Sequence, residues 1–319
     1  MRIRKTVVGS IPRWPMNMEE AIKTAIDVQL RAGIEIVSDG EQRSDMITYF
    51  EQIPGLVHTS RGMTVNSKIS PPEDPSVLTK VRDFMSAKKY LNDLGRGDIP
   101  VKTAITGPIT LGVTCAASGL KYYSGFNDEN LYRDLSRALE SVATKLLQLG
   151  SYVQWDEPGL SAGYMAPSKA LPILNELLDN IQTSKKIPGS VSVHVCGNLA
   201  RISGLLDGLL GLNLDVISLA FSGSTEEQNL NLVSEDLFEK SGKRLGLGCT
   251  KASAAKISDV EDVELVYQRI RSIADRVGSK NVAYAHPDCG LKGTTLDVSE
   301  LILQRLSDAV DRYNRNLPS

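Results

Sequence analysis

The sequence has little of several features that mark particular protein classes. Cysteine occurs only four times in 319 residues, too sparsely for the disulfide framework of a small secreted domain. Reduced thiols with packing, metal or catalytic roles are therefore expected. Basic residues do not outnumber acidic ones, with 36 Lys and Arg against 38 Asp and Glu. An electrostatic nucleic-acid binder needs such an excess, so we expect no nucleic-acid partner.

Long apolar runs are also missing. The longest uncharged stretch, 104–120, is interrupted by three glycines and a proline, whereas a membrane span needs about 20 mostly apolar residues. We interpret this stretch as buried barrel and expect no membrane segment. Residues 1–11 include basic side chains but no apolar segment of about 7–15 residues after them, so no signal peptide is predicted. A cytoplasmic protein is the expectation.

Short apolar, β-branched runs bounded by turn residues recur along the chain, and segments of helical periodicity separate most of them. The runs are Thr6 to Ser10, Ile34 to Asp39, Val101 to Thr106, Tyr152 to Asp156, Val191 to Cys196, Asp215 to Phe221, Arg244 to Cys249 and Val282 to His286. The clear helical segments are Met18 to Ala32, Asn130 to Leu149, Ser168 to Ile181, Val260 to Val277 and Leu296 to Tyr313, with weaker ones at Leu199 to Leu210 and Glu226 to Ser241. Eight strands alternating with helices predict an α/β fold, a (β/α)8 TIM barrel that forms one domain over 1–319.

One segment, 51–100, is too long for a single connection. It contains a predicted hairpin, Leu56 to Ser60 with Met63 to Ser67, and a predicted helix from Val77 to Leu94. We interpret it as an insertion after the second strand.

Polar residues gather at the ends of the predicted strands, where TIM barrels place their chemistry. His194 and Cys196 are two residues apart in one run, so both side chains project to the same side of a strand. Cys289 follows the last strand, and together the three provide the nitrogen and sulfur ligands that Zn²⁺ favours. The alternative is that Cys196 is a core cysteine beside a hydrogen-bonded core histidine, His194, with no metal. Cys115 and Cys249 have no potential ligand beside them and are expected to be buried thiols.

Two thiolate ligands donate charge to a zinc ion and weaken it as a Lewis acid. Such a zinc suits the binding of a substrate thiol, whose pKa it lowers, better than the activation of water. Thiol alkylation is therefore favoured over hydrolysis.

Carboxylates also stand at strand ends. Glu41, Asp156 and Glu157 could bind a cationic amine or simply pair with Arg43 or with lysines. Ser10, after Gly9, could present backbone N–H groups and a hydroxyl to a carboxylate. An amine site, a carboxylate site and a thiol-binding metal together outline a thiol-bearing amino acid.

At these positions the chain resembles the catalytic C-terminal barrel of the cobalamin-independent methionine synthases, and most of all their short archaeal and bacterial core forms. The motifs are Val7 to Pro12, Ser38 to Met46, Ile105 to Thr110, Gln154 to Leu160, His194 to Asn198 and His286 to Lys292. The resemblance implies a (β/α)8 barrel whose zinc activates homocysteine, with ligands His194, Cys196 and Cys289. It also implies homocysteine contacts from Val8, Gly9, Ser10, Glu41 and Asp156.

Departures from the family pattern shape the remaining expectations. Ala220 stands where the family has a glutamate as fourth zinc ligand, so water, substrate sulfur, Glu226 or Glu157 could fill that position. Three folate-related residues of the family align with Thr114, Ala162 and Ser253, the last replacing a proton-donating histidine.

Because a folate amine must be protonated as it leaves, the loss of that histidine predicts a corrinoid methyl donor, either free methylcobalamin or a methylated corrinoid protein partner. Alternatives are methyl or alkyl transfer to another thiol such as coenzyme M, a non-catalytic zinc- or corrinoid-binding homologue, and a decarboxylase or epoxide-thiol transferase on the same barrel.

Overall fold

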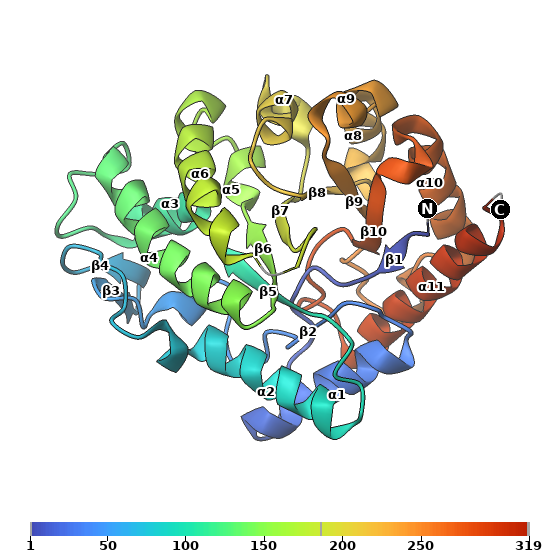
Figure 1. Cartoon of the computed structure of the whole chain (residues 1–319), viewed down its shortest axis with the longest axis horizontal. Helices are drawn as coiled ribbons and strands as arrows, with labels where there is room; N and C mark the ends of the chain where they lie inside the picture. The colour runs from blue at the N-terminus through green and yellow to red at the C-terminus, as the bar shows by residue number, and fades with distance from the viewer. Residues whose placement is uncertain (1, 186, 318–319) are drawn as a thin grey trace.

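A computed structural model describes residues 2–185 and 187–317. Its main feature is an eight-stranded parallel sheet in the order β1-β10-β9-β8-β7-β6-β5-β2, with helices around its outside (Figure 1). The strands are β1 (Arg4–Lys5), β2 (Val37–Ser38), β5 (Val101–Thr106), β6 (Tyr152–Asp156), β7 (Val191–Val195), β8 (Val216–Ala220), β9 (Arg244–Thr250) and β10 (Val282–Pro287). This confirms the α/β class and its eight parallel strands.

The sheet is curled, and its two outer strands approach each other. The backbone N–H of Ile36 donates to Lys5 O at 3.1 Å, and Thr6 and Ile36 form an isolated parallel bridge. The first strand ends earlier than predicted. Gln154 Nε2 donates to Val8 O at 2.9 Å, and Ser38 Oγ donates to Gly9 O at 2.6 Å. Side chains therefore satisfy these carbonyls, and Val8, Gly9 and Ser10 lie in the loop after β1.

Most helices agree with the predicted segments to within three residues, because an apolar face against the sheet imposes a helical period. They are α1 (Met18–Arg31), α4 (Glu129–Gln148), α6 (Pro167–Ile181), α10 (Val263–Val277) and α11 (Leu296–Arg315). The weaker patterns correspond to short helices, α7 (Leu205–Leu210), α8 (Glu226–Leu232) and α9 (Glu235–Ser241). Two helices after β5 and β6, α3 (Pro108–Ser118) and α5 (Pro158–Ser161), were not predicted. Helix α3 is buried on nearly all sides, so its sequence has no polar face to reveal the period.

The segment 51–100 contains both elements expected in it, namely a hairpin of β3 (Leu56–Thr59) and β4 (Gly62–Val65), and helix α2 (Thr79–Asp93). Helix α2 packs against α1 and β5, and it connects β2 to β5 as the regular crossover helix. The interpretation of the whole segment as an insertion is therefore not confirmed. The hairpin is the additional part, and it packs on α3.

Among the residues that the structure describes, no helix is long and apolar enough to cross a membrane.

Candidate metal and amino-acid site

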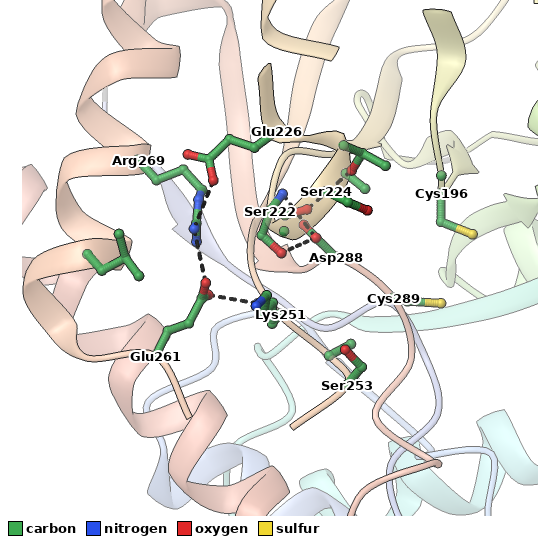
Figure 2. Close-up of a pocket in the computed structure, with 16 residues that line it drawn as sticks. Cys196, Ser222, Ser224, Glu226, Lys251, Ser253, Glu261, Arg269, Asp288 and Cys289 are labelled. Carbon is green, nitrogen blue, oxygen red and sulfur yellow. Dashed lines mark hydrogen bonds and ion pairs between the residues drawn. The ribbon is translucent and has the colours of Figure 1, made fainter. Parts of the chain in front are cut away.

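Three potential metal ligands meet at the carboxyl ends of two strands. His194 lies in β7, Cys196 directly follows that strand, and Cys289 follows β10. One ligand atom from each residue lies within 4.8 Å of the others. Figure 2 shows the Cys196 and Cys289 sulfur atoms directed to the same side. The curled sheet thus brings together two segments that are 93 residues apart, as the sequence predicted.

The donor atoms of this cluster fit a zinc ion. His194 Nδ1 is 2.9 Å from Ser218 Oγ, whereas His194 Nε2 is buried and has no hydrogen-bond partner among the described residues. A buried polar nitrogen without a partner is costly unless a ligand occupies it. Tetrahedral zinc holds such ligand atoms roughly 3.5–3.8 Å apart, so a closer approach of at most about 1 Å would bring these atoms to that spacing.

The two thiols of the cluster influence each other. The contact between the sulfur atoms lowers the pKa of Cys289 and raises the pKa of Cys196, because one proton is shared between them. Outside the cluster, burial raises the pKa of Cys115 to about 12 and also raises the pKa of Cys249. These two cysteines are buried, as expected, and neither belongs to the group of potential metal ligands found among the described residues.

Asp156 lies beside the metal ligands. It ends β6 and pairs in register with His194 on β7, so the two side chains project to the same face of the sheet. Its Oδ1 accepts a hydrogen bond from Gln154 Nε2 at 2.7 Å. Burial raises the pKa of Asp156 to about 6. Gln154 was not predicted as part of the site, although its position two residues before Asp156 placed it on the same side of the strand.

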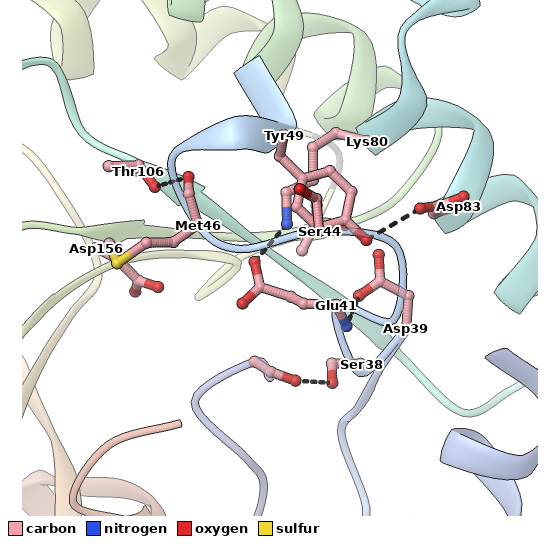
Figure 3. A network of polar contacts seen from close by, with 12 residues as sticks. Ser38, Asp39, Glu41, Ser44, Met46, Tyr49, Lys80, Asp83, Thr106 and Asp156 are labelled. Atoms are coloured by element: carbon pink, nitrogen blue, oxygen red, sulfur yellow. Dashed lines mark hydrogen bonds and ion pairs between the residues drawn. The ribbon is translucent and has the colours of Figure 1, made fainter. Parts of the chain in front are cut away.

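Glu41 is held in an unusual conformation. Its φ of 49° makes it the one non-glycine residue with positive φ in the described part of the chain, a conformation that costs about 1–3 kcal/mol and is often found at functional sites. Its Oε1 accepts from Lys80 Nζ on α2 at 2.5 Å, and both side chains are buried. Lys80 also lies 3.9 Å from the centre of the Tyr49 ring. Figure 3 shows this network, and nothing in the sequence indicated Lys80.

The loop after β1 passes between the acidic residues and the metal ligands. A Cβ atom on Gly9 would lie 3.0 Å from Ala104 Cβ and 3.7 Å from the Glu41 carboxyl carbon. A Cβ on Gly290, next to Cys289, would lie 2.2 Å from Ser10 Oγ. The absence of both Cβ atoms therefore allows the predicted carboxylate-binding loop to lie between Glu41 and Cys289.

A cavity of about 870 Å³ opens beside the two thiols. Ala220, at the end of β8, lines it at the position where the family pattern has a glutamate as fourth zinc ligand. Glu226 forms an ion pair with Arg269, with 3.0 Å between the carboxylate oxygen and the guanidinium nitrogen (Figure 2). The cavity is lined by Cys196, Gly197, Ala220, Ser222 to Glu226, Lys251 to Ser253, Glu261, Leu265, Arg269, Asp288 and Cys289.

Glu157 caps the N-terminus of α3 and is not part of the cluster of potential metal ligands. Its carboxylate accepts from the backbone N–H groups of Ile109 and Thr110 at 3.0 and 2.8 Å, and from Thr110 Oγ1 at 2.6 Å. These contacts satisfy the N-terminus of α3, where free N–H groups attract a negative charge. With Glu157 and Glu226 both engaged elsewhere, three protein ligands remain in the candidate metal cluster.

The fold and this cluster define an α/β protein with a histidine-thiolate site at the carboxyl edge of its sheet. The family model described as "Cobalamin-independent synthase, Catalytic domain" matches residues 5–312. The chain belongs to this family, as the motifs predicted.

Individual relatives agree with this assignment. The methionine synthase of Methanothermobacter marburgensis is 30% identical over 333 residues, covering 97% of this chain and 99% of the relative. A 5-methyltetrahydropteroyltriglutamate–homocysteine methyltransferase of Photorhabdus laumondii is 27% identical, covering 86% of this chain and 36% of the relative.

Among solved structures, the B12-independent methionine synthase from Shewanella sp. W3-18-1 in complex with selenomethionine aligns with a TM-score of 0.77. It has 20% identity and covers 99% of this chain and 98% of that one. This likeness supports the fold. The relatives confirm the prediction of an enzyme of the methyltransferase class.

The predicted corrinoid donor is wrong. The family is cobalamin-independent by description, and its long relatives are named for a methyltetrahydropterin donor, so neither methylcobalamin nor a corrinoid protein partner is supported. The prediction assumed that without a histidine near Ser253 no acid remains. A buried carboxyl group can also hold a proton near neutral pH, because burial raises the pKa of Asp288, which lines the cavity beside the thiols, to about 7.

Proposed function

We propose that the protein is a zinc-dependent methyltransferase that transfers a methyl group from an N5-methylated reduced pterin of the folate type to the sulfur of homocysteine, giving methionine. The observation that carries the proposal is the cluster of His194, Cys196 and Cys289, with the Asp156 carboxylate beside it at the same edge of the sheet.

His194, Cys196 and Cys289 would hold the metal, and the fourth position is open because Ala220 supplies no ligand. Bound zinc lowers the pKa of a coordinated thiol, so the sulfur is a nucleophilic thiolate near neutral pH. Loss of one ligand from a three-ligand site is therefore expected to abolish metal binding and activity together.

Asp156 is the better partner for the ammonium group of the substrate. Glu41 already pairs with Lys80 at 2.5 Å, so the charges of that pair largely cancel. Asp156 accepts a hydrogen bond from the neutral Gln154 amide and forms no ion pair within the described residues. An incoming ammonium beside it would favour the ionised carboxylate. The loop of Ser10 remains the proposed site for the substrate carboxylate.

In the proposed reaction the methyl group moves from N5 of the donor to the sulfur of homocysteine. A sulfur lone pair forms the new S–C bond, the N5–C bond of the donor breaks, and its electron pair remains on N5, which takes up a proton. The names of the long relatives support this class of donor. A second thiol substrate such as coenzyme M is less favoured, because it lacks the ammonium group that Asp156 would bind.

The test is methionine formation by the purified zinc-loaded protein from homocysteine and 5-methyltetrahydropteroyl glutamates, with coenzyme M as the comparison thiol. Saturable methionine formation that is lost in Cys289→Ser together with zinc supports the proposal. Cys249→Ser is the matched control, because Cys249 is a buried thiol outside the cluster. No turnover with any pterin donor by a fully zinc-loaded protein overturns it.

We also propose that the curled sheet closes as a (β/α)8 barrel and that 1–319 is one catalytic domain. The bridge between Thr6 and Ile36 supports closure.

A further inference from the structure

A buried chain of hydrogen bonds extends behind His194, away from the two thiols. His194 Nδ1 is 2.9 Å from Ser218 Oγ, and Ser218 Oγ is 2.8 Å from His286 Nε2. His286 Nδ1 is 2.7 Å from the carbonyl oxygen of Pro287. All three side chains are almost completely inaccessible to solvent, with exposures of 2%, 0% and 0% along the chain.

A glycine in the sheet permits the hydrogen bond between Ser218 and His286. Ser218 on β8 and His286 on β10 belong to strands that are separated by β9. Gly246 of β9 pairs in register with Ser218. A Cβ at Gly246 would lie 3.0 Å from Ser218 Cβ and 2.5 Å from the Tyr284 ring. The missing side chain leaves room for contact across the intervening strand.

The carbonyl at one end of the chain determines where the protons lie. A carbonyl oxygen only accepts, so His286 Nδ1 carries a proton. The His286 ring is buried, and its hydrogen-bond partners among the described residues are Pro287 O, Ser218 Oγ and the backbone of Gly246, with no carboxylate. A buried imidazolium without an anionic partner is costly, so the ring is neutral and Nε2 is an acceptor.

Ser218 transmits this arrangement to His194. Its single hydroxyl proton is donated to His286 Nε2, so its oxygen accepts from His194 Nδ1–H. His194 is then the Nδ1–H tautomer, and its lone pair resides on Nε2, the buried nitrogen without a partner. This is the nitrogen that the candidate metal cluster requires.

We propose that Ser218 and His286 are positioning residues that hold His194 as the metal-binding tautomer before any metal arrives. The inference builds on the proposed zinc site but concerns the metal-free protein, so the two can fail separately. Partners that fix the tautomer of a ligating histidine typically change metal affinity about 10- to 100-fold when they are removed.

The protein suits a direct test because its sequence has only three histidines. The third, His58, is exposed on the hairpin. We would record long-range ¹H–¹⁵N correlation spectra of the ¹⁵N-labelled, metal-free protein. The expected result is that His194 and His286 are both protonated at Nδ1 and not at Nε2, with His58 as the solvent-exposed reference. A His194 ring that carries its proton on Nε2, or on both nitrogens, overturns the proposal.

Variants separate positioning from mere structural support. Ser218→Ala should release His194 into a mixture of tautomers and weaken zinc binding about 10- to 100-fold in competition with a chromophoric chelator. Ser218→Thr retains the hydroxyl and should keep both properties close to wild type, and His58→Ala is the matched control for a lost histidine. If Ser218→Ala weakens zinc binding while His194 stays protonated at Nδ1, the positioning role is refuted. If wild type has the expected tautomer but binds no zinc, the proposed function fails and this inference stands.

Discussion

The buried ion pair between Lys80 and Glu41 makes a strong prediction about stability. The two side chains are 2% and 8% exposed and 2.5 Å apart. Lys80→Met removes the cation and leaves Glu41 buried without its partner, which costs about 3–5 kcal/mol in comparable cases. With an unfolding entropy of about 2.1 cal/mol/K per residue over 319 residues, this corresponds to a fall in Tm of roughly 4–8 °C.

The assay is denaturant unfolding and calorimetry of metal-free protein at pH 7. Lys89→Met is the matched control, because Lys89 lies on the same helix and its ion pair with Asp93 has exposures of 76% and 58%. Such a surface pair contributes about 0–1 kcal/mol. Adding Glu41→Gln to Lys80→Met should restore part of the lost stability. A Lys80→Met protein as stable as the Lys89→Met control would refute the reasoning.

Three further predictions concern the candidate site. Asp156→Asn should raise the KM for homocysteine and leave the zinc content unchanged, as steady-state kinetics and metal analysis will reveal. The pKa of Asp156 is about 6 in the folded protein against an ordinary 3.8, so the folded state binds this proton more tightly than the unfolded state. The stability gained from the bound proton is lost as pH rises from about 4 to 6. Asp156→Asn should therefore become more stable relative to wild type over that range, by up to about 3 kcal/mol in urea unfolding at a series of pH values; a constant difference contradicts this. Ala220→Glu should supply a fourth ligand, tightening zinc binding in chelator competition and weakening homocysteine binding, and unchanged zinc affinity would contradict the three-ligand site.

The elements that the sequence predicted well are those with a strong period. Helix α11 begins at the predicted Leu296, because a single amphipathic face determines its pattern. Helix α3 was missed because it is buried on nearly every side and shows no such face. The first strand was placed too late in the chain because the apolar residues after Lys5 are buried in a loop, where side chains and not a neighbouring strand satisfy the Val8 and Gly9 carbonyls.

The same division applies to the site. The grouping of Cys289 with His194 could be predicted because strand ends in a parallel sheet meet at one edge. The residues that support them could not be predicted, because they depend on packing between distant segments. Lys80 reaches Glu41 from a helix 39 residues later, and Ser218 reaches His286 only because Gly246 leaves space. The donor was wrongly predicted because a missing residue at one aligned position does not reveal which other group can supply a proton.

Zinc K-edge X-ray absorption of the metal-loaded protein, with and without homocysteine, tests the central claim most directly. We predict one nitrogen and two sulfur ligands from the protein, with a light-atom ligand from water, and replacement of that ligand by a third sulfur at about 2.3 Å when homocysteine is added. A sulfur count that stays at two in the presence of saturating homocysteine would contradict activation of the substrate thiol by the metal.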